Sequence, residues 1–173
     1  MKKWNYFYEK IRDELLQIDS DFNTPYLSIL QENTLLLEDW VLRSNLANYK
    51  AIYLNSNLQG FNKMVFLPFH FNFDWCSIKQ EVYYSTRKEP STFDSFISNL
   101  YYLFDFLLSY NSLIECPTYK DNELYYRKFN GEVIYECKFP PMLYDLTFNV
   151  ITTFISIDYC EREILEEKGF YRG

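Results

Sequence analysis

The sequence predicts an α+β fold, an antiparallel sheet of four to five strands with three to four helices packed mainly on one face. Three stretches carry this prediction: a helical stripe of apolar residues in 91–110, strict alternation in 63–75, and a hairpin signature in 123–138. A chain of 173 residues, of which 48% are hydrophobic, is long enough to bury a sizeable core. We therefore expect a single globular domain over residues 1–173.

The central helix is predicted over Ser91–Tyr110, with the Ser91 side chain as its cap. Its apolar residues recur at steps of three and four, which places them in one broad stripe on a helix. A stripe of this width belongs in a core. Its members are Phe93, Phe96, Ile97, Leu100, Leu103, Phe104, Leu107 and Leu108.

The N-terminal part of the chain also predicts helices. Trp4–Ile18 has its apolar residues on one side, as an amphipathic helix does. Thr24 and Pro25 form a start signal, a capping hydroxyl followed by proline at the first helical position. The second helical region either runs as one piece or breaks near Asn33-Thr34, where Thr34 would cap a further helix.

Three strands are predicted in the middle of the chain. Tyr49–Asn55 is short and rich in aromatic and aliphatic residues. Lys63–Trp75 alternates strictly, and Pro68 within it indicates an edge strand or a bulge, because proline cannot donate to a ladder. Ile78–Ser85 follows as a further strand with its apolar residues on one side.

The clearest turn lies in NELYYRKFNGEVIYECKF, where Asn130-Gly131 joins two strand-like runs. This pair favours a two-residue type I′ turn, because both positions need positive φ. The turn sets the register: Phe129 pairs with Glu132, and the pairs continue outward to Glu123 and Lys138, an opposite-charge pair on the solvated face. The residues predicted to face the core are Leu124, Tyr126, Val133, Tyr135 and Cys137.

The C-terminal part predicts one long helix from Met142 to Lys168, ended by Gly169 as a C-cap. Its apolar residues keep a helical spacing. The stretch Val150–Ile157 is rich in β-branched residues, so a strand there is the alternative.

The net charge of −7 and the pI near 4.8 argue against a nucleic-acid binder and against binding to anionic membranes. Both kinds of binding depend on Lys and Arg side chains that neutralise negative charge on the partner. The same charge favours a basic protein partner, since opposite charges speed encounter. The alternative is that the acidity only keeps the protein soluble.

We expect the protein to be cytoplasmic. The charged residues that follow the first lysines interrupt any signal-peptide core, and no stretch approaches the roughly 20 apolar residues of a membrane span. The four cysteines, without CxxC spacing, indicate reduced and mostly buried thiols. They are Cys76, Cys116, Cys137 and Cys160.

No motif for catalysis or for cofactor binding emerges. His70 is the only histidine, so any Cys/His triad depends on it; on the predicted strand it shares a face with Asp74, which makes a His-Asp orienting pair geometrically possible. The cysteines and His70 lack the close ligand pair of a zinc site, and no glycine-rich phosphate loop occurs. We expect no cofactor and no metal.

Two patterns are typical of an interface. The polar side of the central helix lines up carboxylates and hydroxyls at helical steps, namely Asp94, Ser98, Tyr102, Asp105 and Ser109. Tyrosine doublets occur at 83–84, 101–102 and 125–126, and we expect about one ring of each doublet near the surface. Exposed tyrosine beside carboxylates suits protein binding, although a solvated helix face and tyrosines that only fill the core and its rim would look the same.

These observations rank three classes of function. The first is a small binding protein that neutralises a basic toxin or nuclease by covering its active surface, as immunity and inhibitor proteins do; it would be a monomer or a homodimer. The others are a hydrolase using a carboxylate pair or His70, and a small-ligand module with an aromatic pocket. The expected partner-contacting residues are Asp94, Tyr102, Asp105, Glu123, Tyr125 and Glu136.

Overall fold

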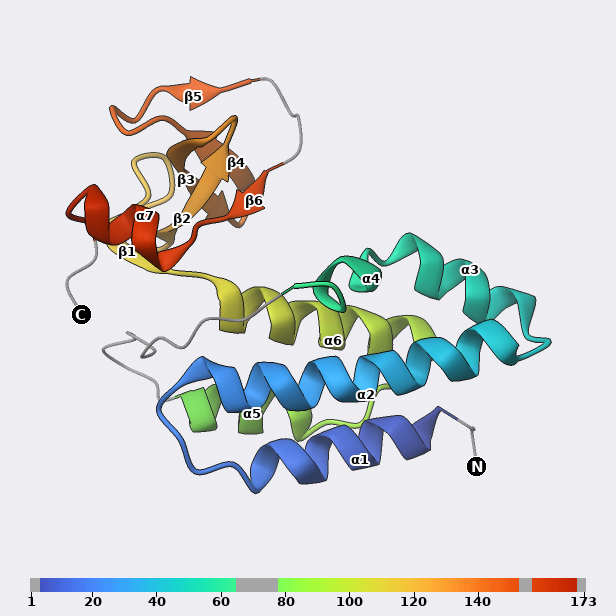
Figure 1. Cartoon of the computed structure of the whole chain (residues 1–173). Coiled ribbons are helices and arrows are strands. Elements are labelled where there is room, and N and C mark those ends of the chain that lie inside the picture. Colours follow the sequence, from blue (N-terminus) through green and yellow to red (C-terminus); the bar gives the residue numbers. More distant parts are fainter. Residues whose placement is uncertain (1–3, 65–77, 153–156, 171–173) are drawn as a thin grey trace. The chain divides into compact units, whose positions relative to one another are not determined.

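The computed structural model describes residues 4–64, 78–152 and 157–170. Within them lie seven helices and an antiparallel sheet of six strands, so the predicted α+β class is confirmed. The chain divides into two compact units, Met1–Leu107 and Leu108–Gly173 (Figure 1). Whether the two units act as one domain stays a prediction.

The first unit is helical. Its first helix, α1, follows the expected amphipathic segment, and α2 is a single helix without a break at Asn33-Thr34. Thr34 does not cap a new helix there, because its hydroxyl donates back to the Leu30 carbonyl at 2.8 Å. The helices of this unit are α1 (Asn5–Leu16), α2 (Asn23–Arg43), α3 (Ala47–Asn55), α4 (Leu58–Phe61), α5 (Ile78–Thr86) and α6 (Phe93–Leu108).

The central helix is confirmed as α6, and its predicted apolar stripe is buried. Thr92 supplies the cap that we expected from Ser91. The Thr92 hydroxyl accepts from the Ser95 amide, and the Ser95 hydroxyl accepts from the Thr92 amide, both at 3.1 Å. This reciprocal pair is a capping box with serine in the place of the usual Glu or Gln.

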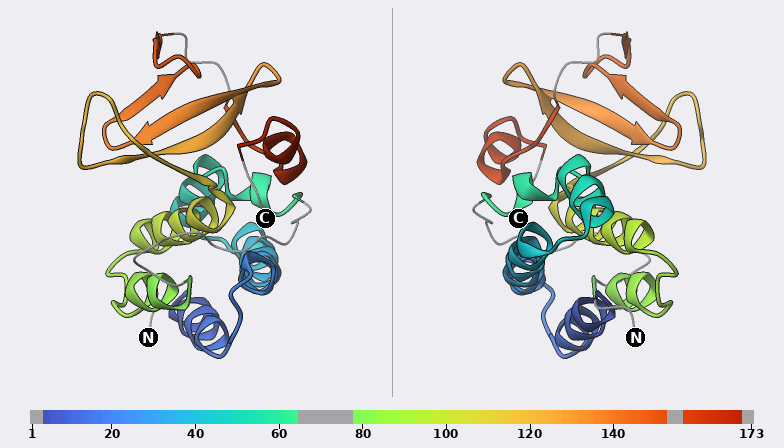
Figure 2. Two further views of the ribbon diagram at one scale, coloured as in Figure 1. Left: turned by 90° about the vertical axis from the view of Figure 1, so that its left-hand side faces the viewer. Right: turned by 90° about the vertical axis from the view of Figure 1, so that its right-hand side faces the viewer.

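Aromatic rings hold α6 to the other helices of the unit. Trp4 stacks on Phe96 with ring centroids 5.5 Å apart, and Tyr49 of α3 stacks on Phe93 at 4.5 Å. Phe61 of α4 stacks on a further α6 residue, Phe104, at 4.6 Å. Figure 2 shows the helices that carry these rings from two sides.

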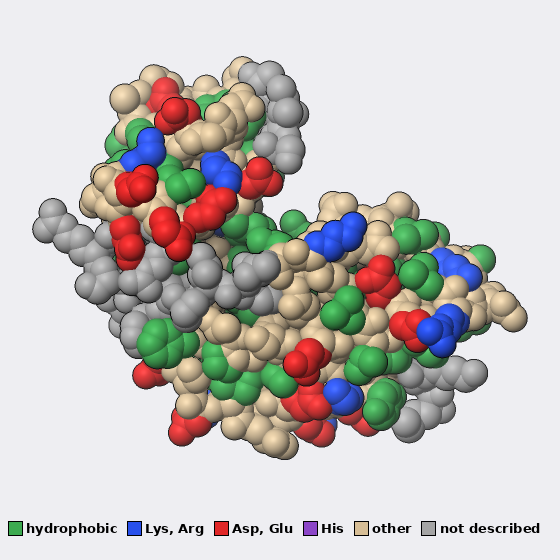
Figure 3. All heavy atoms as spheres, viewed as in Figure 1, with side chains coloured by type: hydrophobic (Ala, Val, Ile, Leu, Met, Phe, Trp, Pro, Cys, Tyr) green, Lys and Arg blue, Asp and Glu red, His purple; other side chains and the backbone are tan. Residues whose placement is uncertain are grey.

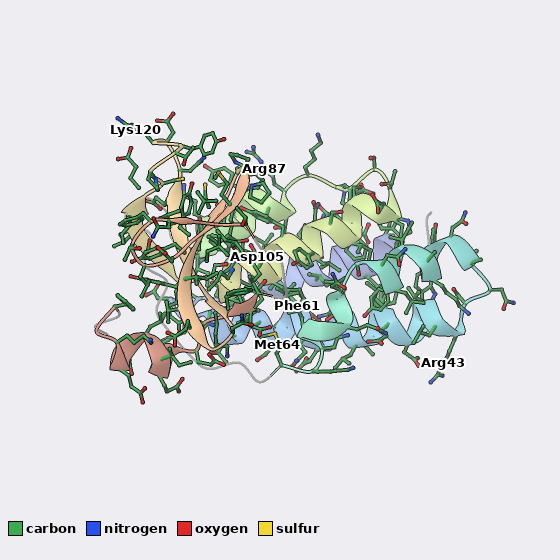
Figure 4. All side chains as sticks on the ribbon, turned by 90° about the horizontal axis from the view of Figure 1, so that it is seen from above. Arg43, Phe61, Met64, Arg87, Asp105 and Lys120 are labelled. Atoms are coloured by element: carbon green, nitrogen blue, oxygen red, sulfur yellow. The ribbon has the colours of Figure 1, made fainter. Side chains whose placement is uncertain are left out.

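The segment after α4 is tied to α2 by one amide. The Gln31 side chain donates to the carbonyl oxygens of Phe61 and Met64, both at 2.9 Å (Figure 4 labels the two acceptor residues). These bonds satisfy carbonyls at the end of a short helix.

Two predicted strands are wrong. Tyr49–Asn55 lies in α3, where Tyr49, Ile52 and Tyr53 have a three- and four-residue spacing that the short run concealed. Ile78–Ser85 lies in α5, which buries Ile78, Val82 and Thr86. A step of four residues fits both a strand face and a helix face, so the pattern did not discriminate. The predicted strand Lys63–Trp75, with His70, falls almost wholly outside the described residues.

The second unit is built on the sheet, in the order β1-β2-β3-β4-β5 with β6 also paired to β2. All its strand pairs are antiparallel. The strands are β1 (Asn111–Glu115), β2 (Glu123–Phe129), β3 (Glu132–Lys138), β4 (Pro141–Tyr144), β5 (Val150–Ile151) and β6 (Asp158–Tyr159), and helix α7 (Arg162–Glu167) follows.

The predicted hairpin is confirmed in its turn and in its register between Leu124 and Phe129, and the residues predicted to face the core are buried. Phe129 pairs with Glu132 and the pairing continues to Leu124 with Cys137. Asn130 and Gly131 both have positive φ, 50° and 82°, as a type I′ turn requires. All five residues predicted to face the core are at most 5% exposed.

The predicted helix over 142–168 is wrong for most of its length, since the described residues of that range hold β4, β5, β6 and, as their one helix, the short α7. Asp145 ends β4 by accepting from the amides of Thr147 and Asn149, at 2.8 and 2.9 Å. Such local bonds compete with a helix. Gly169, with φ of 74°, ends α7 as expected.

Candidate partner-binding site

A pocket of about 360 Å³ opens on the first unit where the end of α3 and the turn after it face α6. It combines apolar walls with carboxylate, amide and hydroxyl groups. One of its residues, Asp94, is among the expected partner-contacting residues. The lining consists of Ile52, Asn55, Ser56, Asn57, Asp94, Ile97, Ser98 and Tyr101.

Helix α6 supplies one wall through a regular spacing. Asp94, Ser98 and Tyr101 are four and three residues apart, so they follow one another along the same side of the helix. Asp94 is in the first turn, where the helix dipole favours its negative charge. The Tyr101 ring is 41% exposed and meets the Phe61 ring edge-on at 5.4 Å, which holds it at the pocket margin.

The opposite wall is the end of α3 and the turn into α4. Ser56 closes α3, because its amide and its hydroxyl both donate to the Tyr53 carbonyl, at 3.1 and 2.6 Å. Asn57 then takes the left-handed conformation with φ of 61°, which asparagine tolerates better than most residues. The sequence indicated this turn from its Asn-Ser-Asn cluster, but assigned it to the end of a strand.

This set of groups suits a cation carried on an aliphatic stem. The Asp94 carboxylate and the amide oxygens of Asn55 and Asn57 accept hydrogen bonds, while Ile52 and Ile97 offer apolar surface to methylene groups. A tyrosine ring also attracts a cation placed over its face. A lysine or arginine side chain has both parts.

The structure does not bring all the expected helix residues into this pocket. Tyr102 is 43% exposed and donates its hydroxyl hydrogen to Glu81 Oε1 of α5 at 2.9 Å. Its ring also stacks on Phe106. Asp105 is half-buried. From the predicted polar side of the helix, the pocket includes Asp94 and Ser98, and it adds Tyr101, which that prediction did not contain.

The expected hairpin residues lie in the second unit, where two of them have cationic neighbours. Glu136 Oε2 is 2.8 Å from Arg127 Nε, an ion contact that is not aligned as a hydrogen bond. Tyr125 lies under the Lys138 ammonium, 4.1 Å from the ring centroid. Glu123 is half-buried and opposite Glu115 in the adjoining strand.

Arg127 is the buried centre of this group, at 3% exposure. In addition to its ion contact with Glu136, Arg127 donates a hydrogen bond to Ser109 Oγ at 3.1 Å. Its guanidinium also lies 4.7 Å from the centroid of the Tyr159 ring. Lys138 also donates to Ser109, at 3.0 Å. The face that sequence reasoning took as solvated is therefore partly an internal charge network.

The exposure of the two tyrosines in each doublet depends on whether the doublet lies in a helix or in a strand. On helices both rings of a doublet are exposed, at 51% and 47% for Tyr83 and Tyr84 and at 41% and 43% for Tyr101 and Tyr102. In the strand only one doublet member, Tyr126, is buried at 5%. The expectation of one surface ring per doublet holds for the strand and is wrong for the helices, because consecutive helical residues are only about 100° apart.

Carboxylates gather on the second unit around α7. Figure 3 shows Asp and Glu side chains grouped over that part of the surface. Lys128 pairs with Glu161, and Lys168 with Glu132 at 3.3 Å, while Glu163 and Glu167 are exposed on α7. Part of the negative charge thus lies around α7, where two of the carboxylates already have a cation nearby.

Within the described ranges, no three His, Cys, Asp or Glu side chains come together as a metal site would need. No helix in the described part of the chain is both long and apolar enough to cross a membrane. The sequence matches no protein-family model, and neither a curated protein nor a solved structure is similar to it.

Proposed function

We propose that this protein works by binding a protein with a basic surface, and that a lysine or arginine of that partner enters the α6 pocket. The finer proposal is that the partner is a basic toxin or nuclease whose active surface is covered in the complex. Such a partner uses cationic side chains to hold phosphate, and those side chains are the ones that Asp94 would attract.

The observation that supports this best is the composition of the pocket. A carboxylate, two amides and two hydroxyls stand beside two isoleucines and an exposed tyrosine ring in one hollow. The Asp94 carboxylate is exposed, so a lysine or arginine can reach it from solvent while the stem of that side chain covers the apolar walls beside it.

Capture of partner from an extract of the native host tests the proposal when charge-reversed variants are compared. Asp94→Lys should weaken capture by about tenfold or more, since like charges placed together cost several kcal/mol. Glu32→Lys is the matched control, because Glu32 is an exposed carboxylate of α2 outside the pocket lining. It makes the same change in net charge.

High salt should weaken capture by the wild-type protein and leave the residual capture by Asp94→Lys largely unchanged. Equal capture by the Asp94→Lys and Glu32→Lys proteins would contradict a role for the pocket. Capture that is insensitive to salt in all three proteins would contradict the basic partner itself.

A further inference from the structure

The Glu38 carboxylate holds the turn between α3 and α4, residues 56–57, which forms part of one wall of the α6 pocket. Glu38 is half-buried on α2 and does not itself line the pocket. Before the turn, Tyr53 donates its hydroxyl hydrogen to Glu38 Oε2 at 3.2 Å. After the turn, the side-chain amides of Gln59 and Asn62 donate to Oε1 and Oε2, both at 2.7 Å. One carboxylate therefore binds the chain on both sides of the turn.

Tyr53 connects this carboxylate to the pocket. It is 0% exposed, and its hydroxyl also accepts from the Asn62 amide at 3.2 Å. Burial and the Glu38 carboxylate raise the pKa of Tyr53, so its hydroxyl keeps the proton that it donates. The Tyr53 carbonyl accepts from the amide and the hydroxyl of Ser56, a pocket residue, at 3.1 and 2.6 Å. The side chain and the carbonyl of one buried residue thus link Glu38 to the pocket wall.

The bonds within the turn are local, so they shape it without fixing its place in the first unit. Asn57, its second residue, has the left-handed φ of 61°. Glu38 ties both ends of this turn to α2. Gln31 of α2 also holds this part of the chain, but only beyond the turn, at the carbonyls of Phe61 and Met64.

Hydrogen-bond acceptors lie on both walls of the pocket. Helix α6 contributes Asp94 and Ser98, and the opposite wall contributes Asn55 and Asn57, whose side chains make no hydrogen bond within the described part of the chain. A guanidinium spreads five N–H donors over a plane and can serve acceptors on two walls, whereas an ammonium has three donors on one atom. The placement of the walls relative to each other therefore decides which cation is bound better.

We propose that Glu38 makes the α6 pocket selective for arginine over lysine, by holding the turn where Asn55 and Asn57 reach the same guanidinium as Asp94. This inference rests on the proposed function, because the arginine is the side chain of the same basic partner. Glu38 is a positioning residue, since it acts through the residues that it binds and does not touch the ligand. A turn that is already in place loses less conformational freedom when the ligand binds.

Nuclear magnetic resonance titration with two blocked tripeptides, one with arginine and one with lysine in the middle, measures the selectivity. Wild type should bind the arginine peptide at least about fivefold more tightly, because the additional donors reach the second wall. Glu38→Gln should weaken arginine binding until the two affinities are nearly equal. A glutamine has a single acceptor oxygen, and its own amide hydrogens oppose those of Gln59 or Asn62.

Glu14→Gln is the matched control. Glu14 of α1 is also half-buried, accepts from an asparagine side chain, that of Asn33 at 2.7 Å, and lies outside the pocket lining. Its substitution should lower the stability of the unit and leave the selectivity unchanged, so a merely structural effect is recognised. Gln59→Met removes one bond and keeps the Glu38 charge. It should reduce the selectivity in part, which keeps the test decisive if Glu38→Gln does not fold.

A selectivity that is the same in wild type, Glu38→Gln and Gln59→Met would overturn the proposal, as would a wild-type protein that prefers lysine. If neither peptide binds to wild type, the proposed function fails and the selectivity with it. Amide hydrogen exchange then still tests the role of Glu38 in the turn. The Ser56 amide should exchange faster in Glu38→Gln and not in Glu14→Gln; equal exchange in both would overturn that role as well.

Discussion

Arg127 is a charged residue that the alternation of the strand would place in solvent but that the structure buries. Its position on the strand face opposite the apolar one predicted a solvated side chain, yet only 3% of it is exposed. The cost of burying a guanidinium is met by Glu136, Ser109 and the Tyr126 carbonyl. Sequence periodicity states which residues share a face, but not whether another segment covers that face.

The first prediction concerns this ion pair. Glu136→Gln leaves a buried arginine without its counter-charge, so we expect a loss of about 3 kcal/mol in the free energy of unfolding. Arg127→Met alone should cost less, because the Glu136 side chain keeps 16% of its area in water. Denaturant unfolding of both single variants and the double variant measures the coupling. Strict additivity would mean that the two side chains do not interact.

A second residue-scale prediction follows from Asp145. Bonds from Thr147 and Asn149 lower the pKa of Asp145 from 3.8 to about 2 in the folded protein. The folded state therefore holds this proton less tightly than the unfolded chain does. The stabilisation is present above about pH 3.8 and is lost as the pH falls through about 2.

Asp145→Asn removes the titration and keeps the size of the side chain. The difference in unfolding free energy between wild type and this variant should shrink as the pH is lowered through that window. Chemical denaturation at a series of pH values measures it. A difference that stays constant would show that the Asp145 turn does not carry the effect.

Elements were predictable where local chemistry and periodicity agreed. The hairpin was correct in its turn and in the pairs from Phe129–Glu132 to Leu124–Cys137, because Asn130-Gly131 fixes the turn and the turn fixes the register. The helix α6 was correct because its stripe is long. Short segments failed: α3 and α5 each span nine residues, and at that length a few apolar residues fit either periodicity.

The hairpin turn gives the element-scale prediction. Gly131→Ala places a Cβ at φ of +82°, although no atom lies within 4 Å of it. The cost is therefore one of backbone conformation, about 1–2 kcal/mol. Gly60→Ala is the control, because Gly60 lies in α4 with no neighbour within 4 Å and no positive φ. It should be neutral or slightly stabilising. Equal effects would contradict the type I′ assignment.

For the whole molecule, the patterned stretches predicted the fold class, and composition predicted the sign of the net charge but not where the charges lie. The pocket is brought about by tertiary structure, because Asn55 and Asp94 are 39 positions apart in the chain yet line one hollow. Asp94 could be anticipated because it is a carboxylate on the polar side of a strong helix. Its pocket neighbours on the α3 turn could not, since that segment was taken for a strand.

The prediction of a single domain can be tested with the tryptophans, which all precede residue 108. Their fluorescence reports on the first unit, whereas Gly131→Ala perturbs the second. If the chain unfolds as one cooperative domain, this substitution should lower the denaturant midpoint seen by tryptophan fluorescence as much as that seen by far-ultraviolet circular dichroism. An unchanged fluorescence midpoint would show that the two units unfold independently.

The central claim is that the α6 pocket binds a cationic side chain, and nuclear magnetic resonance tests it most directly. The labelled protein is titrated with a blocked tripeptide that has arginine in the middle, and then with the same peptide carrying citrulline, its neutral isostere. We predict shifts of the pocket amides with the arginine peptide alone, shifts that Asp94→Asn abolishes and Glu32→Gln leaves intact. Equal shifts with both peptides, or an Asp94→Asn protein that responds like wild type, would contradict the claim.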